Sequence, residues 1–277
     1  KQILADKILK KLLFNLYYGA AFTFVTLAGL LLLPWILLVN VFFLGRSVDS
    51  ALRRAIRFYG WVLVCVVPFM APVTVENKGE KFHFPAILVA NHNSGIDPYL
   101  FGAVPIENCF LTSWPFNIPV YGRIMRLAGY IDSKKGWDEI REKGAELLDS
   151  GSSLTIWPEG HRSRDGRLGR FKKGAFVLAV ETGYPVVPVS ILGSGEILSP
   201  GKRFLSPGKV KLILHNPVYP DTHGDKEQSI TALRDTVRQI IEKTLQENLH
   251  FSSAPDILRD NPKTSVSDVQ GRQHGSI

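Results

Sequence analysis

Long apolar stretches dominate the first quarter of the chain. Residues 16–44 contain no Asp, Glu, Lys or Arg, and residues 58–75 form a second uncharged stretch. About 20 apolar residues are enough for a helix to span a bilayer, so the first stretch can cross or enter a membrane. The helix of the second stretch should end early, because Pro68 and Pro72 cannot continue it. The pattern predicts a membrane-embedded helical element at the N-terminus.

Two arrangements of these stretches are open. In one, residues 16–44 cross the membrane and residues 58–75 cross back. In the other, the first stretch bends near Pro34 and returns to the same face, with residues 58–75 packed on the following domain or lying in the interface. Basic residues flank the first stretch on both sides, and basic flanks favour the cytoplasmic face, so we expect the re-entrant hairpin. The flanking cations are Lys7, Lys10, Lys11, Arg46, Arg53, Arg54 and Arg57.

From Glu76 onward, short apolar runs alternate with segments of helical periodicity. This alternation indicates an α/β fold with a mostly parallel sheet flanked by helices. The last segment is polar with little periodicity, which predicts a mobile tail. The predicted boundaries are 1–75 for the membrane-associated segment, 76–251 for the α/β domain and 252–277 for the tail. The expected strands are 86–90, 108–112, 130–132, 154–157, 186–192 and 210–214, and the expected helices are 98–104, 120–128, 137–148, 173–182 and 226–249.

Charge is distributed unevenly along the chain. The whole chain has 33 Lys and Arg against 25 Asp and Glu, a formal net charge of +8. Residues 1–75 hold eight basic and two acidic residues, so they contribute +6 of that excess. Basic charge beside apolar stretches favours an anionic membrane surface over nucleic acid. The two cysteines, Cys65 and Cys109, cannot form a disulfide framework, which fits a reducing compartment.

A first group of polar residues follows the strand expected at 86–90. The strand leads into Asn91 and His92, and Asp97 stands before Pro98 at the start of a helix. Asp is a common N-cap and Pro is favoured at the first helical position, so Asp97 could be a helix cap only. The functional alternative is a His–Asp dyad. Asp97 would then orient the His92 ring, and the second ring nitrogen of His92 would take up a proton near neutral pH.

A second group follows the strand expected at 154–157. The chain continues from Trp157 as Pro-Glu-Gly-His-Arg-Ser and then becomes a basic loop, opposed only by Asp165. Arg presents a planar fork to phosphate oxygens, and the absence of a side chain at Gly lets backbone N–H groups approach an anion. We therefore expect an anion site here rather than a merely solvated loop. Its cations are Arg162, Arg164, Arg167, Arg170, Lys172 and Lys173.

Together the two groups resemble the glycerolipid acyltransferase family, and most closely its PlsC-like 1-acylglycerol-3-phosphate acyltransferases. The resemblance rests on Asn-His-x-x-x-x-Asp at 91–97 and Pro-Glu-Gly-x-Arg-Ser at 158–163, and it covers roughly residues 58–220. Two weaker blocks, 127–132 and 187–191, are also similar to the family. The family's version of the second motif usually reads Phe-Pro-Glu-Gly-Thr-Arg-Ser, so Trp157 and His161 depart from it.

The resemblance implies an enzyme that transfers an acyl chain from acyl-CoA or acyl-carrier protein to the free hydroxyl of a lysophospholipid. The implied acceptor is 1-acylglycerol-3-phosphate and the product phosphatidic acid. The implied partners are a phospholipid leaflet, the acceptor and the donor, with no nucleic acid, cofactor or metal. The implied location is the cytoplasmic face of a membrane, a bacterial inner membrane. The implied catalytic residues are His92 and Asp97, and the implied ligands of the acceptor's phosphate and glycerol are Glu159, Gly160, Arg162, Ser163, Lys172 and Lys173.

Three alternatives stay open at this point: transfer to another lysolipid headgroup, lipid hydrolysis with Ser94 as nucleophile, and lipid binding by a degenerate site. Ser94 lacks the first glycine of a nucleophile elbow, and the intact His92–Asp97 pair argues against degeneracy. A metal site built from these two residues and His161 matches no strong zinc spacing. The oxyanion of a tetrahedral intermediate needs hydrogen-bond donors, for which a backbone N–H near Gly160 is the candidate.

Overall fold

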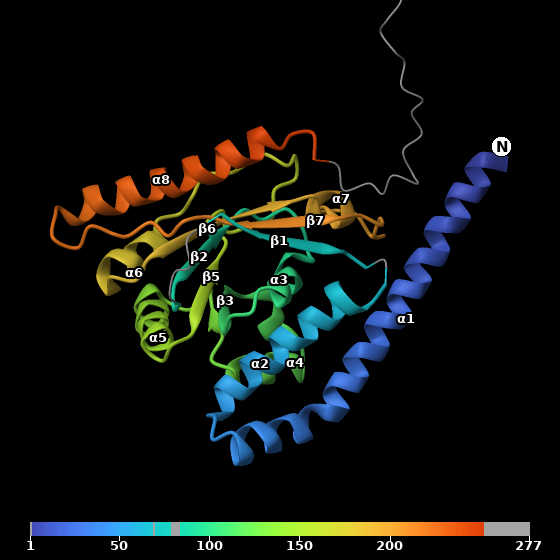
Figure 1. Cartoon of the computed structure of the whole chain (residues 1–277), viewed down its shortest axis with the longest axis horizontal. Coiled ribbons are helices and arrows are strands. Elements are labelled where there is room, and N and C mark those ends of the chain that lie inside the picture. Colours follow the sequence, from blue (N-terminus) through green and yellow to red (C-terminus); the bar gives the residue numbers. More distant parts are fainter. Residues whose placement is uncertain (1, 69, 79–83, 252–277) are drawn as a thin grey trace, which may run out of the picture.

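A β-sheet forms the centre of the chain from Val73 onward in the computed structural model, which describes residues 2–68, 70–78 and 84–251 (Figure 1). Within these residues the sheet has seven strands in the order β1-β7-β6-β2-β5-β3-β4. Neighbouring strands are parallel except β6 and β7, which are antiparallel. The strands are β1 (Val73–Asn77), β2 (Ile87–Ala90), β3 (Asn108–Thr112), β4 (Ile131–Asp132), β5 (Ser153–Ile156), β6 (Val186–Leu192) and β7 (Val210–Leu214).

Two groups of helices cover this sheet (Figure 1). In the first group α5, α6 and α8 pack on one another and on β5, β2 and β6, respectively. In the second group α2 packs on α3, α4 and β3. The helices are α1 (Gln2–Leu38), α2 (Val48–Trp61), α3 (Asp97–Leu100), α4 (Tyr121–Leu127), α5 (Trp137–Asp149), α6 (Gly174–Thr182), α7 (Ser194–Leu198) and α8 (Lys226–Glu247), with short π-helical segments η1 (Val39–Phe43) and η2 (Val62–Val66) and 3₁₀ turns η3 (Phe101–Ala103) and η4 (Trp114–Asn117).

The predicted fold class, a mostly parallel α/β sheet flanked by helices, is confirmed. β3, β6 and β7 have the predicted bounds, and β2, β4 and β5 agree within one residue at each end. Every residue of β2, β5 and β6 is buried. A parallel strand covered by helices on both faces needs mostly apolar side chains in both directions, which is why β2 and β6 stand out as apolar runs. The polar Ser153 and Thr155 of β5 are hydrogen-bonded inside the domain. The predicted tail, 252–277, lies outside the described residues.

The second apolar stretch contributes to three elements. Its first residues end α2, its helical continuation η2 ends at Val66 before Pro68, and its last residues begin β1, a strand that the sequence analysis does not predict. β1 pairs with β7 across the predicted boundary between residues 75 and 76. Leu63, Val64 and Met70 are buried in the core of the domain. The expected packing of residues 58–75 on the domain is therefore confirmed.

The predicted hairpin bend at Pro34 is wrong. The helix continues through Pro34 to Leu38, and η1 extends it to Phe43. An interior proline removes one backbone hydrogen bond and kinks a helix that is otherwise strong on both sides, and the last part of α1 runs in a different direction from the rest (Figure 1). The chain reverses instead at residues 44–47, where Gly45 has a φ of +62°, which suits glycine.

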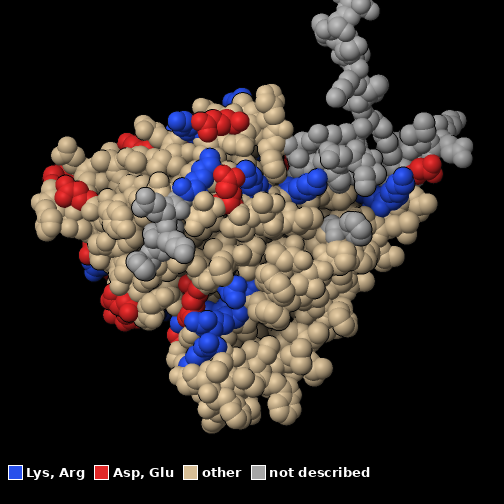
Figure 2. Space-filling model, in the orientation of Figure 1, with Lys and Arg blue, Asp and Glu red and all other residues tan. Residues whose placement is uncertain are grey.

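The helical stretch Ile8–Phe43 is long and apolar enough to cross a membrane, and its most apolar window is not buried in the protein. Figure 2 shows Lys and Arg side chains gathered over α2, while the surface toward the turn between α1 and α2 is uncharged. This composition is what a lipid environment requires of a protein surface. Membrane association is therefore supported by α1.

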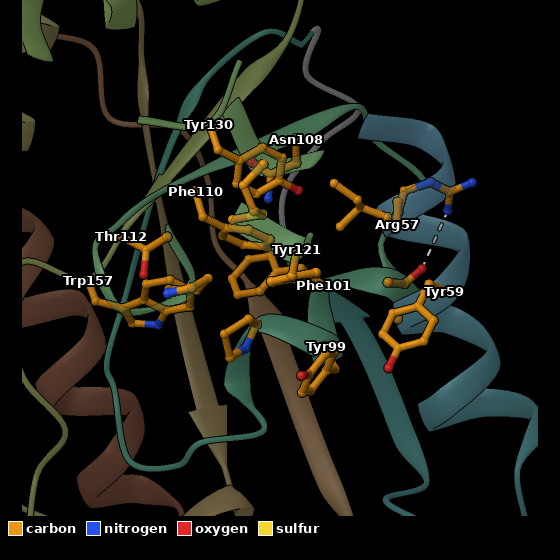
Figure 3. Close-up of a pocket in the computed structure, with 16 residues that line it drawn as sticks. Arg57, Tyr59, Tyr99, Phe101, Asn108, Phe110, Thr112, Tyr121, Tyr130 and Trp157 are labelled. Carbon is orange, nitrogen blue, oxygen red and sulfur yellow. Dashed lines mark hydrogen bonds between the residues drawn. The ribbon is translucent and has the colours of Figure 1, made fainter. Parts of the chain in front are cut away.

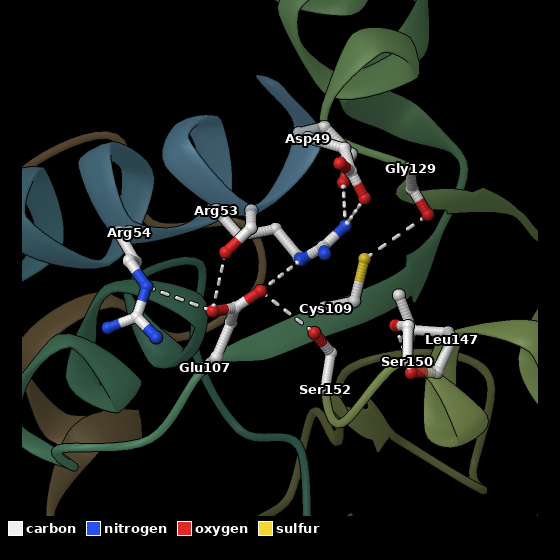
Figure 4. Close-up of polar contacts among 11 residues, drawn as sticks. Asp49, Arg53, Arg54, Glu107, Cys109, Gly129, Leu147, Ser150 and Ser152 are labelled. Atoms are coloured by element: carbon white, nitrogen blue, oxygen red, sulfur yellow. Dashed lines mark hydrogen bonds and ion pairs between the residues drawn. The ribbon is translucent and has the colours of Figure 1, made fainter. Parts of the chain in front are cut away.

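A buried ionic cluster fastens α2 to the domain (Figure 4). The Arg53 side chain is only 3% exposed, and its guanidinium contacts Glu107 (Nε–Oε1 2.9 Å), Asp49 (Nη1–Oδ2 2.8 Å) and the carbonyl oxygen of Ala128 (3.0 Å). Glu107 stands immediately before β3. The cluster is completed by contacts of Glu107 with Ser50, Arg54 and Ser152.

His215, which follows β7, is a second buried ionisable group. Its Nε2 lies 2.9 Å from the hydroxyl of Ser190 on β6. Burial lowers the pKa of His215 from 6.5 to about 4, and the nearby charge of Lys78 acts in the same direction. His215 is therefore neutral in the folded protein at pH 5 to 7.

We expect acid to destabilise the protein through His215. The unfolded chain binds a proton at this histidine below pH 6.5, whereas the folded chain binds it only near pH 4. Stability from this residue is thus complete at pH 7.5 and is lost as the pH falls toward 4. After allowance for solvent screening, the free energy of unfolding should fall by about 1–2 kcal/mol between pH 7 and pH 5. Denaturant unfolding of the protein in detergent at both pH values measures this fall in the free energy of unfolding.

Two variants test the assignment to His215. His215→Gln should remove this part of the pH dependence, and His161→Gln, at an exposed histidine, should not. Equal pH dependence in the unmodified protein and both variants would contradict the assignment.

Candidate active site

The two sequence motifs meet at the carboxyl ends of two adjacent parallel strands. β2 ends at Ala90 and β5 at Ile156, and the pairing of Val89 with Ile156 brings these ends level. Ligand sites of open α/β sheets lie beyond the carboxyl ends of the strands. His92 therefore stands beside the Pro-Glu-Gly motif, although 67 residues separate His92 from Glu159.

The predicted His–Asp dyad is present in the structure. His92 Nδ1 lies 2.8 Å from Asp97 Oδ2, and Asp97 is completely buried. The same Oδ2 accepts the backbone N–H groups of Asn93 and Ser94, each at 2.9 Å. Because a carboxylate only accepts, Nδ1 carries the ring proton, and Nε2 is left with a free lone pair.

The helix-cap alternative for Asp97 is not what the structure adopts. Ile96 occupies the N-cap position of α3, and no side chain caps that helix. The two backbone groups that Asp97 accepts belong to the loop before the helix. Asp97 therefore shapes the loop that carries His92 and orients the imidazole at the same time.

Trp157, the residue that departs from the family pattern, packs flat against His92. The two rings stack with centroids 4.8 Å apart and planes 28° apart. On the same indole, Phe110 stacks at 5.4 Å and Phe101 packs edge-on at 6.1 Å. His92 is thus held at its edge by Asp97 and on its face by Trp157.

Glu159 joins the two motifs through backbone contacts. Its Oε1 accepts the N–H of His92 at 2.9 Å and its Oε2 accepts the N–H of Gly169 at 2.8 Å. Glu159 is buried, and this burial raises the pKa of the carboxyl group. The backbone N–H of Ser163 donates to the carbonyl of His92 at 2.7 Å and strengthens the same junction. Glu159 therefore fixes the basic loop to the strand end that carries His92.

Arg162 is the cation that reaches toward the dyad. Its Nη1 lies 3.2 Å from the position that a Cβ atom at Gly95 would take, inside the loop between His92 and Asp97. Arg162 is exposed and has no hydrogen-bond or ion-pair partner among the residues that the structure describes. An unpaired guanidinium next to a histidine base is suited to bind a phosphate.

Comparison with known proteins agrees with this geometry. Residues 72–192 match the model of the Acyltransferase family. Human 1-acyl-sn-glycerol-3-phosphate acyltransferase beta is 31% identical over 197 residues, which cover 68% of this chain and 68% of the human protein. The chain belongs to the PlsC-like glycerolipid acyltransferase family.

Other members of the family match over different shares of their length. The chloroplastic 1-acyl-sn-glycerol-3-phosphate acyltransferase BAT2 of Brassica napus is 38% identical over 167 residues, 57% of this chain and 48% of the relative. The chain spans about half the length of such plant relatives. The crystal structure of the LPA acyltransferase PlsC from Thermotoga maritima superposes with a TM-score of 0.64 at 27% identity, covering 89% of this chain and 99% of that one.

Several residues of the family's second motif are engaged in contacts within the protein. Both side-chain oxygens of Glu159, an implied ligand of the acceptor, accept backbone N–H groups. The Ser163 hydroxyl donates to Asp165 within the loop. Lys173 pairs with Glu227 at the start of α8, with Nζ–Oε2 at 2.7 Å, so it is engaged outside the dyad.

Gly160 also differs from expectation. Its N–H donates to the carbonyl oxygen of Trp157 at 3.0 Å, so the structure does not support it as the oxyanion donor. Gly160 has a φ of +75°, and a Cβ there would lie only 2.5 Å from Nζ of Lys172. The glycine therefore makes room for Lys172, which reaches over the turn as the second cation of the site.

The hydrolase and metal alternatives find no support in the geometry. The Ser94 hydroxyl is buried, donates to the carbonyl of Leu198 at 2.8 Å and accepts the N–H of Ile96. It is not placed as a nucleophile. In the described part of the chain, no three His, Cys, Asp or Glu side chains gather closely enough to hold a metal ion.

Trp157 also lines a narrow aromatic pocket (Figure 3). It holds about 60 Å³ and is enclosed by residues of α2, α3, β3 and α4. The sequence pattern did not identify this pocket, because its walls come from elements far apart in the chain. Its aromatic lining includes Tyr59, Tyr99, Phe110, Tyr121, Tyr130 and Trp157.

Proposed function

We propose that the protein transfers an acyl chain from acyl-CoA or acyl-carrier protein to the free hydroxyl of a lysophospholipid, with 1-acylglycerol-3-phosphate as acceptor and phosphatidic acid as product. The observation that carries this proposal is the His92–Asp97 pair with the unpaired Arg162 beside it. The names of the relatives, which are 1-acyl-sn-glycerol-3-phosphate acyltransferases, support the choice of acceptor.

In the proposed reaction His92 is the general base. Its Nε2 takes the proton from the acceptor hydroxyl, and the hydroxyl oxygen attacks the thioester carbonyl of the donor. Asp97 holds the Nδ1–H and stabilises the imidazolium that forms. When the tetrahedral intermediate collapses, the C–S bond breaks and the leaving thiolate takes the proton back from Nε2. The acceptor itself is the nucleophile, so no acyl-enzyme is needed.

Arg162 and Lys172 are the proposed ligands of the acceptor phosphate. Both are exposed cations at the junction between the motifs, and neither has an ion-pair partner among the described residues. A forked guanidinium can bind two phosphate oxygens at once, whereas an ammonium acts as a point charge. Gly160 and Gly95 give these two side chains the space that they need.

We place this reaction at the cytoplasmic face of a membrane, a bacterial inner membrane. The apolar helix α1 supports the membrane location. Thioester donors are water-soluble, whereas the acceptor is a lipid, so the reaction requires a site at the boundary between water and leaflet.

The experiment that tests the proposal compares thiol release with and without acceptor. Purified full-length protein in detergent is given acyl-CoA or acyl-carrier protein, and a panel of lysolipids is added. We expect slow release with donor alone and strong acceleration by 1-acylglycerol-3-phosphate, with phosphatidic acid as product. Rapid donor hydrolysis without acceptor, or an acylated Ser94 found by mass spectrometry, would replace the transferase by a hydrolase. If a different lysolipid accelerates thiol release most, the proposed acceptor headgroup is wrong but the acyl transfer reaction stands.

We expect Arg162→Ala to raise the acceptor KM by about ten- to a hundredfold, because a charge-assisted hydrogen bond contributes about 1.5–3 kcal/mol. Steady-state kinetics with acceptor and donor varied separately would measure this change. Lys173→Ala is a matched control, because Lys173 belongs to the same loop but pairs with Glu227, and its kinetics should stay near those of the unmodified protein. A raised donor KM in Arg162→Ala, with the acceptor KM unchanged, would instead assign this cation to the donor.

A further inference from the structure

Three large apolar side chains are exposed within a single short segment of the α/β domain. Trp114, on η4, is 70% exposed, Val120 is 56% exposed and Leu127, at the end of α4, is 63% exposed. Val120 directly precedes α4 and Leu127 is its last residue, so the two exposed side chains stand at opposite ends of this short helix. One side of α4 is buried through Gly122 and Met125. Exposed apolar residues that cluster in this way mark a surface that binds something.

The backbone at Val120 makes the exposure more notable. Val120 has a φ of +64°, and the N–H of Tyr121 donates back to the carbonyl of Pro119 at 2.6 Å. A β-branched residue is costly in this region of backbone space, where glycine or asparagine would fit. Val120 is therefore unfavourable in two respects: its apolar side chain is exposed, and this β-branched residue has a positive φ. Residues with unfavourable backbone angles concentrate at functional sites.

The charges of the segment point to the chemistry of its partner. Residues 113–131 contain no Asp or Glu. Arg123 and Arg126, on α4, are exposed, and within the described ranges neither has a hydrogen-bond or ion-pair partner. Tryptophan and arginine beside exposed aliphatic side chains are typical of the boundary between lipid headgroups and acyl chains.

The position of the segment relative to α1 agrees with a lipid partner. α4 packs on α2, which follows the apolar helix across the turn at residues 44–47. Figure 1 shows α4 beside α2 at the end of the molecule where this turn lies. Phe42 and Phe43, at the end of η1, are also exposed. Exposed apolar side chains therefore continue from the N-terminal helices onto the α/β domain, where Arg123 and Arg126 accompany them.

We propose that η4 and α4, residues 114–127, form a second membrane contact, independent of α1, on an anionic leaflet. Trp114, Val120 and Leu127 lie at the level of the first acyl carbons, and Arg123 and Arg126 bind lipid phosphates. The inner side of the same segment, through Pro115, Tyr121 and Met125, lines the aromatic pocket. The contact therefore sets the wall of that pocket against the leaflet. It goes beyond the proposed reaction and does not depend on it.

Site-specific labelling tests this contact in the full chain. Single cysteines replace Trp114, Leu127 or Tyr219 in a background in which Cys65 and Cys109 are alanine, and each is labelled with the fluorophore NBD. Tyr219 follows β7 and is 67% exposed, so it is a control of equal exposure outside the segment. The proteins are reconstituted into phosphatidylcholine–phosphatidylglycerol vesicles, with or without lipid that carries a doxyl quencher high on the acyl chain.

We expect a blue shift and a loss of emission by doxyl lipid at positions 114 and 127, and neither at 219. Emission at 114 and 127 that matches 219 would overturn the contact. A blue shift that is insensitive to doxyl lipid and grows with protein concentration would assign the surface to a second copy of this chain, and would overturn it as well. Loss of transfer activity alone would bear on the proposed reaction and not on this result, because the readout needs no turnover.

Discussion

Replacing His92 by alanine should lower turnover by about 10²–10⁴-fold, the usual contribution of a positioned general base. Without the imidazole, no group in the dyad can take the proton from the acceptor hydroxyl. Asp97 cannot substitute, because it is completely buried and its Oδ2 is held by the two backbone N–H groups of the loop. The measurement is the steady-state rate with saturating acceptor and donor.

Two further variants separate chemistry from structure. His161→Ala removes an exposed histidine of the neighbouring motif and should leave turnover nearly unchanged. Asp97→Asn should be severe as well, because an amide cannot match a carboxylate as acceptor for three N–H groups. Thermal melts should show His92→Ala folded like the unmodified protein. Turnover of His92→Ala within a few-fold of the unmodified rate would rule out His92 as the base.

Replacing Glu107 by glutamine should destabilise the protein by about 3–5 kcal/mol, because it leaves the Arg53 cation buried without its main partner. Burial alone would raise the pKa of Glu107, but hydrogen bonds from Ser50, Arg53 and Ser152 and the charge of Arg53 hold it below the ordinary value. The carboxylate is therefore charged at neutral pH, and its contribution to stability is lost as the pH falls below about 4.5.

For a chain of this size the loss corresponds to a melting temperature lower by roughly 6–20 °C. Glu139→Gln provides the matched control, because Glu139 forms an exposed pair with Lys143 on α5, and exposed pairs contribute at most about 1 kcal/mol. A similar small change in both variants would show that the cluster in Figure 4 does not hold α2 on the domain. If the cluster holds α2 on the domain, limited proteolysis should cut the Glu107→Gln variant first near α2.

Elements with strong local signals could be read from the sequence. Strands that are mostly buried are mostly apolar and are bounded by polar or turn residues, so the sequence predicts β3, β6 and β7 at their observed bounds. The sequence predicts α5 and α6 within one residue at each end: α5 has apolar positions at helical spacing, and α6 is an apolar run that Gly183 ends. β1 was missed because its residues merge with the apolar stretch before them, and only its pairing with β7 distinguishes a strand from the end of a membrane segment.

The reversal of the N-terminal element shows a different limit. Proline lowers helix stability, so the sequence predicts the bend at Pro34. In the structure the strongly apolar residues on both sides carry the helix through Pro34, and the chain turns at Gly45, where a positive φ is available without cost. Whether the chain reverses at Pro34 or at residues 44–47 depends on where the following helix, α2, packs. Here α2 is drawn to the domain by Arg53 and Glu107, which are 54 residues apart.

For the site, the sequence by itself determined the dyad, since the four residues between His92 and Asp97 at a strand end leave room for a turn that returns one side chain to the other. It also determined the cation-rich loop. Only the tertiary structure decided where its cations lie: Arg162 lies beside Gly95 in the dyad loop, Lys172 lies over Gly160, and Lys173 is paired with Glu227. The tertiary structure likewise decided that the Glu159 carboxylate accepts backbone N–H groups and that Trp157 stacks on the face of the His92 ring. Spacing along a chain fixes which residues can meet locally, but burial and long-range pairing decide which partner each side chain takes.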